Sequence, residues 1–456
     1  MSISLTSIRN PFFIGIAGSG MSALAQYLQG TGRSVRGSDR LFANSSEIRD
    51  KLEAMGIHCF QQDGSGINEQ VDCIIVSTAV EDSVPEVQLA KQRQLPILHR
   101  SDLLAMIAAS RKTIAVAGTS GKSTTSAMLF SILERAGYGP GIISGAGLTR
   151  LINQGKIGNA EVGTGDWLII EADESDGSIV HYHPEIGVLL NIDKDHQELD
   201  ELVRLFTIFR DQSNQFSTNR SYALTGSLSL SADRDFSNVP SSNTAYVATD
   251  FNQSGLQIQF RINQVPFVLN QVGKHNMENA LAAATVANLI GISLETASYA
   301  LRDYEGIYRR HQVLGQKNGV WVIDDFAHNP AKCAASIRAC QPIASKLIAW
   351  FQPHGFKPTR FLRNDYVQEI TAAMRPGDQI WMSEIYYAGG TAQRDISAND
   401  LIQDLREKGV QAFFVADRSD FLKNVREHLS GDCVLLLMGA RDPSLEQFSK
   451  QVWNDL

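Results

Sequence analysis

The residues best suited to chemistry form a loop of glycines, hydroxyls and one lysine. It reads Gly118-Thr119-Ser120-Gly121-Lys122-Ser123-Thr124 and directly follows the apolar run 113–117. Glycines let backbone N–H groups converge on an anion, a lysine reaches phosphate oxygens, and a hydroxyl can hold Mg²⁺. Val116 stands where the strict form of this motif has its first glycine. The loop still predicts binding of nucleotide phosphates, with a plain strand-to-helix turn as the alternative.

Acidic residues follow the next apolar run. The sequence Trp167-Leu168-Ile169-Ile170 ends at Glu171, and the carboxylates of Asp173, Glu174 and Asp176 come shortly after it. Hard carboxylate oxygens suit Mg²⁺ beside phosphates, so Glu171 is the first candidate ligand. The other three are equally well interpreted as a solvated turn. The polar segment 191–196 offers His196 as a ligand of a second metal ion, although a single histidine more often only satisfies local hydrogen bonds.

A second glycine loop lies near the N-terminus, again between a predicted strand and a predicted helix. It reads Gly15-Ile16-Ala17-Gly18-Ser19-Gly20-Met21-Ser22, and Ser38-Asp39 come after the next predicted strand. The placement suggests a dinucleotide fold with an acidic ribose contact, but the glycines follow GxxGxG rather than GxGxxG. We expect the diphosphate of a nucleotide-linked ligand here, with a purely structural tight turn as the alternative.

The elements that must position these loops are strands of parallel sheets. Short apolar runs alternate with helix-like stretches in three series, which begin near Pro11, Thr113 and Trp321. This alternation is typical of parallel strands joined by crossover helices. A chain of 456 residues is also too long for one hydrophobic core. We therefore predict an α/β protein of three domains: a Rossmann-like domain at 1–107, a central P-loop ATPase-like domain at 108–313, and a Rossmann-like domain at 314–456.

Composition and charge argue against several classes of protein. Hydrophobic residues make up 43% and charged residues 20% of the chain, which is typical of globular rather than disordered or fibrous proteins. A net charge of −8 argues against a nucleic-acid surface but permits a local anion site. No apolar segment approaches the length of a membrane span. The 5 cysteines contain no CxxC pair and are expected to be buried, reduced thiols. We expect a cytoplasmic protein without nucleic-acid or membrane partners.

Four further motifs connect these loops to a known family. They are Gly-Lys-His-Asn-Met-Glu-Asn-Ala at 273–280, Tyr-Arg-Arg-His-Gln at 308–312, Asp-Asp-Phe-Ala-His-Asn-Pro at 324–330 and Phe-Gln-Pro-His at 351–354. Together with the loops above, they make the chain resemble the Mur ligases of bacterial cell-wall synthesis almost from end to end. The similarity is greatest to the branch that joins L-alanine to UDP-N-acetylmuramate. The resemblance implies an ADP-forming acid–amino-acid ligase that uses ATP and Mg²⁺ and acts through an acyl phosphate.

The resemblance also implies roles for residues of the central domain. Lys122 and the loop amides would hold the ATP phosphates. Ser123 or Thr124, together with Glu171, would hold one Mg²⁺, and His196 would serve a second. Some Mur ligases have a carbamoylated lysine in the segment after this histidine, but no lysine occurs between Lys194 and Lys274, so that ligand is excluded here.

Other family positions match residues beyond the central sheet. Asn276 and Asn279 would contact adenine, Arg310 would reach the γ-phosphate, and Asp325 and His328 would close on ATP and the incoming amine. Without the resemblance, the asparagines are equally a helix start, the arginine part of a solvated pair, and the histidine part of a turn. The order of the motifs along the chain favours the functional interpretation.

Substrate recognition is where the pattern departs from the family. Gly15 to Ser22 and Ser38-Asp39 match the loops that bind the UDP part, and His354 and Arg360 are further candidates for substrate contacts. The segment Gly355-Phe356-Lys357-Pro358-Thr359-Arg360 lacks two arginines that the family has there. The amine and even the UDP-sugar therefore stay open. The alternatives are a paralogous ligase that adds another amino acid or a recycled murein peptide, and an inactive nucleotide-binding regulatory protein.

Overall fold

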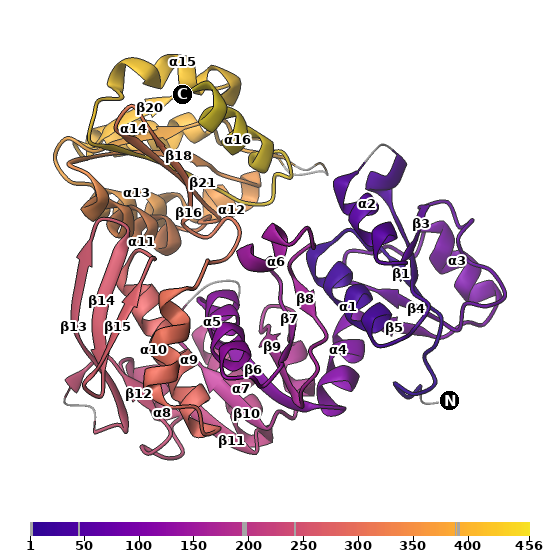
Figure 1. Ribbon diagram of the computed structural model, residues 1–456. Coiled ribbons are helices and arrows are strands. Elements are labelled where there is room, and N and C mark those ends of the chain that lie inside the picture. The colour runs from indigo at the N-terminus through magenta and orange to yellow at the C-terminus, as the bar shows by residue number, and fades with distance from the viewer. Residues whose placement is uncertain (1–2, 44–45, 194–197, 241–242, 388, 390–392) are drawn as a thin grey trace. The chain divides into compact units, whose positions relative to one another are not determined.

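The chain divides into two units in the computed structural model, and each is described by itself (Figure 1). The first unit comprises residues 1–250, 260–268 and 277–306, and the second comprises 251–259, 269–276 and 307–456. The structure describes residues 3–43, 46–193, 198–240, 243–387, 389 and 393–456. No helix within these ranges combines the length and apolar character that crossing a bilayer requires. All 5 cysteines are buried and unpaired, which confirms the prediction of buried free thiols.

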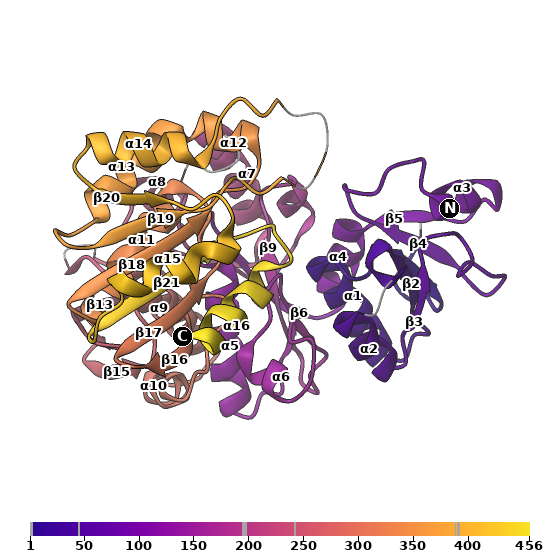
Figure 2. The same cartoon turned by 90° about the horizontal axis from the view of Figure 1, so that it is seen from above.

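The N-terminal part of the first unit is a parallel sheet in the order β3-β2-β1-β4-β5. Its strands are β1 Pro11–Ile14, β2 Arg36–Asp39, β3 His58–Gln61, β4 Cys73–Val76 and β5 Ile97–His99, and its helices are α1 Ser19–Gly30, α2 Glu47–Ala54, α3 Pro85–Gln92 and α4 Arg100–Ala109. Phe13 and Ile75 pack with apolar residues of α1, α2 and α4, whereas Phe12 and Ile74 pack with those of α3. Helices therefore cover both faces of the sheet (Figure 2). The strand order reverses between β1 and β4, where open α/β sheets bind ligands.

A larger sheet of the first unit has the order β11-β10-β6-β9-β7-β8. All neighbouring strands in it are parallel except that β8 pairs antiparallel with β7. Its strands are β6 Lys112–Ala117, β7 Gly141–Ile143, β8 Ala160–Glu161, β9 Trp167–Ala172, β10 Ile186–Leu189 and β11 Gln215–Thr218. Its helices are α5 Lys122–Arg135, α6 Thr149–Asn153, α7 Leu199–Gln212 and α8 Ala223–Ser227. Strand β6 is fully buried after its first residue, as expected for a strand covered on both faces.

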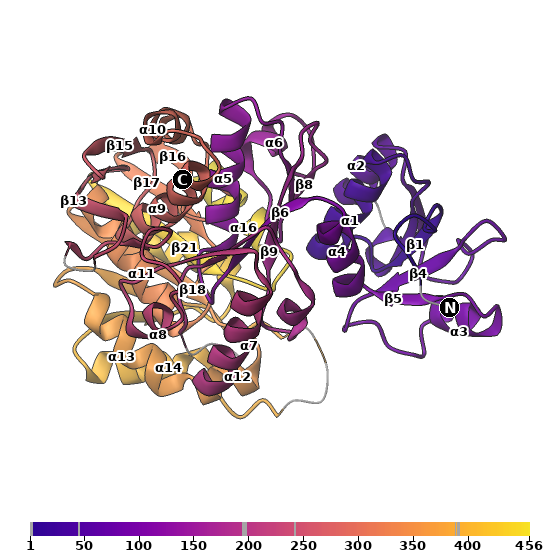
Figure 3. The same ribbon diagram turned by 90° about the horizontal axis from the view of Figure 1, so that it is seen from below.

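The polar stretch after β11 leads into a small sheet and a pair of helices. The sheet has the order β12-β13-β14-β15, with strands β12 Phe236–Ser237, β13 Tyr246–Ser254, β14 Gln257–Ile262 and β15 Val265–Leu269. The helices are α9 Lys274–Leu289 and α10 Leu294–Arg302. Helix α10 packs against α5, and the two lie side by side in Figure 3.

The second unit contains a sheet in the order β16-β17-β21-β18-β19-β20. All neighbouring strands in it are parallel except that β16 pairs antiparallel with β17. Its strands are β16 Gln312–Lys317, β17 Val320–Asp325, β18 Lys346–Gln352, β19 Gln379–Met382, β20 Gln411–Phe414 and β21 Cys433–Gly439. Its helices are α11 Pro330–Cys340, α12 Phe356–Phe361, α13 Arg363–Ala373, α14 Ala398–Glu407, α15 Phe421–Val425 and α16 Leu445–Asp455. Leu436 packs with residues of α11, α13 and α14, and its neighbour Leu437 packs with those of α15 and α16. The predicted α/β class with parallel sheets is confirmed.

Candidate active site

Three adjacent strands bring the predicted nucleotide residues to one edge of the larger sheet. Strand β6 lies between β9 and β10, with Val116 opposite Glu171 and Ala117 opposite Leu189. The carboxyl ends of parallel strands meet at the same edge, so the loop after β6 is flanked by Glu171 on one side and by Asn191 on the other. Sequence segments about fifty and seventy residues apart therefore converge for a simple topological reason.

The glycines of the loop give it a shape that other residues would strain. Gly121 caps α5 in the left-handed region with φ +85°, and Gly118 has φ +137°. A side chain at Gly121 would also collide with the amide of Asn279. Helix α5 begins at Lys122, directly after the capping residue Gly121. The loop thus presents a helix N-terminus without acidic residues in its first turn, which favours an anion.

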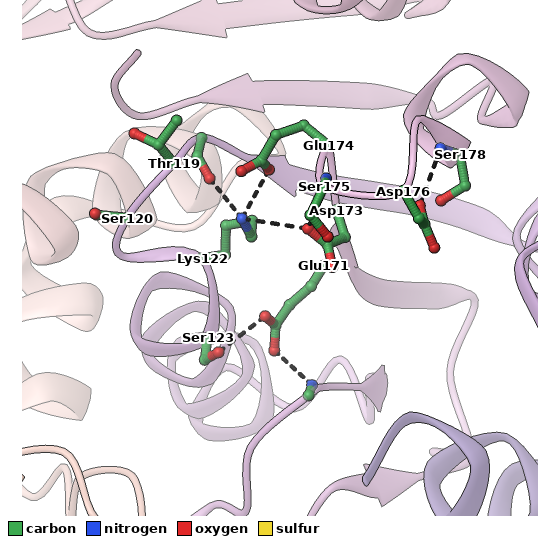
Figure 4. Close-up of polar contacts among 12 residues, drawn as sticks. Thr119, Ser120, Lys122, Ser123, Glu171, Asp173, Glu174, Ser175, Asp176 and Ser178 are labelled. Atoms are coloured by element: carbon green, nitrogen blue, oxygen red, sulfur yellow. Dashed lines mark hydrogen bonds and ion pairs between the residues drawn. The ribbon is translucent and has the colours of Figure 1, made fainter. Parts of the chain in front are cut away.

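Lys122 is held at the loop by both backbone and carboxylates (Figure 4). Its Nζ donates to the carbonyl of Gly118 at 2.7 Å and to Oε2 of Glu174 at 2.7 Å, and Asp173 Oδ1 lies 3.7 Å away. Burial lowers the pKa of Lys122, but the charges of Glu174 and Asp173 outweigh this and raise the pKa above its ordinary value. The lysine is therefore a permanent cation. Glu174, for which the sequence left a functional carboxylate and a solvated turn equally open, is only 5% exposed and pairs with it.

Glu171 is fixed by three hydrogen bonds. Its Oε2 accepts from Ser123 Oγ at 2.8 Å, and its Oε1 accepts from Ser144 Oγ at 2.5 Å and from the backbone N–H of Gly145 at 2.7 Å. The pair of Ser123 and Glu171 joins two of the predicted metal ligands (Figure 4). The sequence did not point to Ser144, because a serine in a glycine-rich turn before β8 has no local pattern that relates it to a distant carboxylate.

Asn191 braces the phosphate loop from the opposite side. Its Oδ1 accepts from the backbone N–H of Ser120 at 2.8 Å and from Thr119 Oγ1 at 2.9 Å, and its Nδ2 donates to the carbonyl of Ser120 at 3.1 Å. Thr119 Oγ1 also accepts from the backbone N–H of Asp193 at 3.0 Å. Sequence reasoning considered this segment only for His196, which lies outside the described residues. The sequence does contain a signal for Asn191, because it is a polar residue that follows a buried strand beside the phosphate loop.

The donors at this edge fit Mg²⁺ rather than a metal held entirely by protein. Within the described residues, no group of three or more His, Cys, Asp or Glu side chains could enclose a metal ion. Mg²⁺ is ordinarily held by one or two protein oxygens together with phosphates and water. The hydroxyl of Ser123 and the carboxylate of Glu171 are such oxygens, and Thr124 is partly exposed one residue further along α5.

The N-terminal glycine loop is stabilised by the residues that were predicted to bind a ribose. The backbone N–H groups of Gly15 and Ile16 donate to the carbonyl of Ser38 at 2.8 and 3.1 Å, and that of Ala17 donates to Asp39 Oδ2 at 2.9 Å. Asp39 is 9% exposed, so its carboxylate serves the loop itself.

The first turn of α1 shows which parts of this loop a ligand can reach. Met21 and Ser22 are buried, whereas Gly18 and Ser19 at the start of the helix are exposed. A Cβ on Gly20 would lie 3.0 Å from Nη1 of Arg100, and Nη2 of Arg100 is 2.9 Å from Asp176 Oδ2. Arg100 adds a positive charge beside the loop. Sequence reasoning overlooked it because it follows β5, far from the motif.

The two predicted adenine contacts both lie on α9. Asn279 is 7% exposed, and its Oδ1 accepts from Thr125 Oγ1 of α5 at 3.2 Å, which connects it to the phosphate-loop helix. Asn276 is 4% exposed and donates through Nδ2 to the carbonyl of Val272 at 2.8 Å. Asn276 belongs to the second unit by its contacts, whereas Asn279 belongs to the first.

In the second unit, Asp325 ends β17 and is tied to the segment before β16. Its Oδ1 accepts from the backbone N–H of His311 at 3.0 Å. Burial raises the pKa of Asp325, but His311 and Arg310 outweigh this and hold the pKa below its usual range. The Arg310 guanidinium lies over the ring of Phe326, 4.7 Å from its centroid. Asp325 and Arg310 are therefore neighbours.

His328 and His354 lie together beyond the carboxyl ends of β17 and β18. Their ring centroids are 5.6 Å apart, and Nδ1 of His328 is 2.9 Å from the carbonyl oxygen of Phe326. Burial, and secondarily the charge of Lys332, lowers the pKa of His328 from 6.5 to about 4. The imidazole of His328 is consequently neutral at physiological pH.

Arg360 lies apart from this histidine pair. It is the second-last residue of the short helix α12 and forms an ion pair with Asp395, in which both side chains are about half exposed. Such exposed pairs contribute little stability. Arg360 is thus a surface residue. To bind it, a substrate anion would have to replace Asp395.

Models of protein families match three consecutive parts of the chain. Residues 12–112 match the Mur ligase family, catalytic domain; residues 116–287 match the Mur ligase middle domain; and residues 309–441 match the Mur ligase, glutamate ligase domain.

Individual relatives match nearly the whole chain. Proteins named UDP-N-acetylmuramate–L-alanine ligase are 31% identical in Carboxydothermus hydrogenoformans and 33% identical in Dictyoglomus turgidum, each over 94% of this chain and 93% of the relative. The solved UDP-N-acetylmuramate-alanine ligase of Thermotoga maritima superposes with a TM-score of 0.81 at 24% identity, over 98% of both chains. A murein peptide ligase of Psychrobacter arcticus superposes with a TM-score of 0.67 at 21% identity, again over 98% of both chains. The phosphate loop, the sheets that carry it and these full-length relatives together establish that the chain belongs to the Mur ligase family.

Proposed function

We propose that the protein is an ATP-dependent ligase of peptidoglycan precursor synthesis that joins L-alanine to UDP-N-acetylmuramate. The substrates are those in the names of relatives that align with 94% of the chain. The observation that carries the chemistry is the phosphate loop, where a helix N-terminus, Lys122 and the Ser123–Glu171 pair meet. ATP hydrolysis to ADP and phosphate drives the ligation.

The proposal divides the work among three parts of the chain. Residues 1–107 bind the UDP-sugar through the loop from Gly15 to Ser22, and residues 108–313 bind ATP. Residues 314–456 close on ATP and the amine, which excludes water from a reactive intermediate. The neighbouring Asp325 and Arg310 support a nucleotide-facing role for the third part.

The first step makes an acyl phosphate. An oxygen of the substrate carboxylate attacks the γ-phosphorus of ATP, the bond to the bridging oxygen breaks, and ADP leaves. Protein groups contribute mainly position and positive charge to such a transfer, and Lys122 and Arg310 are the cations available for it. Ser123 or Thr124 with Glu171 would hold Mg²⁺, which neutralises phosphate charge when bound.

The second step forms the amide bond. The amine nitrogen attacks the acyl carbon, phosphate leaves, and the nitrogen loses a proton. His328 is a candidate acceptor because its lowered pKa of about 4 keeps the ring neutral at pH 7. The same low pKa makes it a weak base, so orienting the amine is its second possible contribution.

A second candidate function is ligation of another amino acid or of a murein peptide. The observation that favours it is the segment from Gly355 to Arg360, which forms the short helix α12 and whose arginine pairs with Asp395. These residues occupy the place where the family has arginines that reach the substrate.

Phosphate release by the full-length protein separates the possibilities. Release that needs both UDP-N-acetylmuramate and L-alanine supports the first candidate, and release with a different amine or peptide supports the second. No release with a broad panel of amines would mean a nucleotide-binding protein without ligase activity. Lys122→Ala should abolish release, whereas Lys112→Ala, at the exposed start of β6, should not.

A further inference from the structure

We propose that a pocket behind the phosphate-loop helix binds a small zwitterion, of the size of a free amino acid or dipeptide. The pocket lies within the first unit and has a volume of about 440 Å³, which suits a small molecule. It is bordered by the second half of α5, the start of α6 and the end of α10. Six of its residues carry the argument: Phe130, Glu134, Arg135, Leu148, Tyr304 and Glu305.

The pocket is separate from the proposed nucleotide site. Its wall on α5 runs from Phe130 to Arg135, whereas the phosphate loop meets the same helix at Lys122. The first pocket residue on α5, Phe130, lies eight positions after Lys122, which corresponds to about 12 Å along an α-helix. A ligand here would therefore leave the phosphate loop free, and the inference does not depend on the proposed ligase activity.

Tyr304 lines the pocket and carries a buried polar group whose hydrogen bonding is incomplete. The side chain is 6% exposed, and its hydroxyl has no hydrogen-bond partner among the described residues. Buried polar groups in folded proteins almost always have a partner, so this hydroxyl marks an incomplete interaction. Burial also raises the pKa of Tyr304, so the hydroxyl keeps its proton and can donate it to an acceptor.

The charged residues around the pocket match a molecule with both signs of charge. The Arg135 guanidinium lies 4.2 Å from the centroid of the Tyr299 ring, and no carboxylate of the described residues pairs with it. In the proposed complex, Arg135 and Tyr304, which both line the pocket, bind the carboxylate of the ligand. Glu305 accepts from Asn153 Nδ2 at 2.8 Å and retains acceptor capacity for an ammonium group. Phe130 and Leu148 supply an apolar wall for a side chain.

The pocket also borders the connection between the two units. Gly306, which lines it, is the last residue of the first unit, and its carbonyl accepts from the backbone N–H of Thr149 at 3.1 Å. The chain passes from this wall into the second unit at Ile307, three residues before Arg310.

Calorimetry with the full-length protein tests the proposal. The probes are L-leucine and L-alanyl-L-leucine, whose apolar side chain suits Phe130 and Leu148, and the controls are L-leucinamide and N-acetyl-L-leucine, which each lack one charge. We expect one probe molecule to bind per chain, and each control to bind at least about 10-fold more weakly, since charge-assisted hydrogen bonds are the strong ones. Failure of both probes to bind would overturn the proposal.

Variants locate the binding. Tyr304→Phe and Arg135→Gln should each weaken probe binding by about 10-fold or more. Tyr299→Phe is the matched control, because it removes the hydroxyl of an exposed tyrosine on α10, five positions before Tyr304, and keeps the ring under Arg135; its affinity should be unchanged. Lys122→Ala should also bind the probes normally. An unchanged melting temperature shows that Tyr304→Phe is folded, and full affinity in both pocket variants would place the binding elsewhere.

Discussion

The ammonium group of Lys122 lies 2.7 Å from Glu174 Oε2 and 2.7 Å from the carbonyl oxygen of Gly118. The lysine is thus held by its own loop and by a buried carboxylate. A phosphate that enters the loop must take over this cation, so Glu174 acts as a competitor for it.

Because a phosphate and Glu174 compete for Lys122, substitutions of Lys122 and of Glu174 should affect activity differently. Lys122→Ala should reduce kcat/KM by about 100-fold or more, because a positioned charge at the transferring phosphate is lost. Glu174→Gln should keep activity within about 10-fold and bind ATP at least as tightly, since only the competitor is weakened. Steady-state phosphate release and ATP titrations measure both. A Glu174→Gln enzyme as inactive as Lys122→Ala would show that the carboxylate itself takes part in catalysis.

Ser144 should matter through its 2.5 Å hydrogen bond to Glu171. Ser144→Ala frees one carboxylate oxygen, and loss of a group that orients a metal ligand typically costs about 10- to 100-fold in metal affinity or activity. The Mg²⁺ concentration for half-maximal activity should therefore rise. Ser227→Ala is the control, since its hydroxyl bonds only to the carbonyl of Leu224 and is exposed. An unchanged Mg²⁺ dependence in Ser144→Ala would contradict the assignment of Glu171 as a ligand.

Asn191 should affect both stability and ATP binding, because it bonds Ser120 and Thr119 of the loop. Asn191→Ala removes these bonds and should lower the free energy of unfolding by about 1–3 kcal/mol. Asn191→Asp keeps the acceptor but adds a negative charge beside the phosphates, so its KM for ATP should rise more than its stability falls. Urea unfolding and ATP kinetics separate the two effects. Equal behaviour of the variants in both assays would count against the bracing role.

His328 should make stability depend on pH. Its pKa falls from 6.5 to about 4 on folding, so between these values the unfolded chain binds a proton that the folded chain does not. Stability therefore rises with pH through this window and is lost as pH falls from 6.5 towards 4, by at most about 1.4 kcal/mol per pH unit.

Replacing this histidine isolates its share of the pH dependence. His328→Gln should reduce the slope of the stability curve between pH 6.5 and 4, measured by urea unfolding at successive pH values, and leave the part that His275 contributes, because burial lowers the pKa of His275 to about 3. His58→Gln, at an exposed position of β3, should leave the wild-type curve intact. A His328→Gln curve with the wild-type slope would mean that the imidazole does not resist protonation in the folded protein.

The local elements were the most predictable part of the fold. The apolar run 113–117 lies within β6 Lys112–Ala117, and the run from Trp167 to Ile170 lies within β9 Trp167–Ala172. Runs of buried apolar residues between turn signals carry this information. The order of strands does not follow from such runs, because any strand can pair with another that has equally apolar faces. The placement of β6 between β9 and β10 therefore had to come from the structure.

The residues of the site also divide into those that a local sequence pattern predicts and those that depend on contacts between distant segments. Lys122, Ser123 and Glu171 follow from motif and strand end, since their chemistry is local to one segment. Ser144 and Asn191 act across the sheet on residues 27 and 71 positions away, and no spacing rule connects them. Glu174 was visible as an acidic residue, but only its burial identifies it as the partner of Lys122.

Product analysis with full-length protein tests the central claim most directly. Incubation with ATP, Mg²⁺, UDP-N-acetylmuramate and L-alanine should yield UDP-N-acetylmuramoyl-L-alanine by mass spectrometry, with one ADP and one phosphate formed for each amide bond. ATP hydrolysis without any amide product, whichever amine or peptide is supplied, would contradict the account of this protein as a ligase.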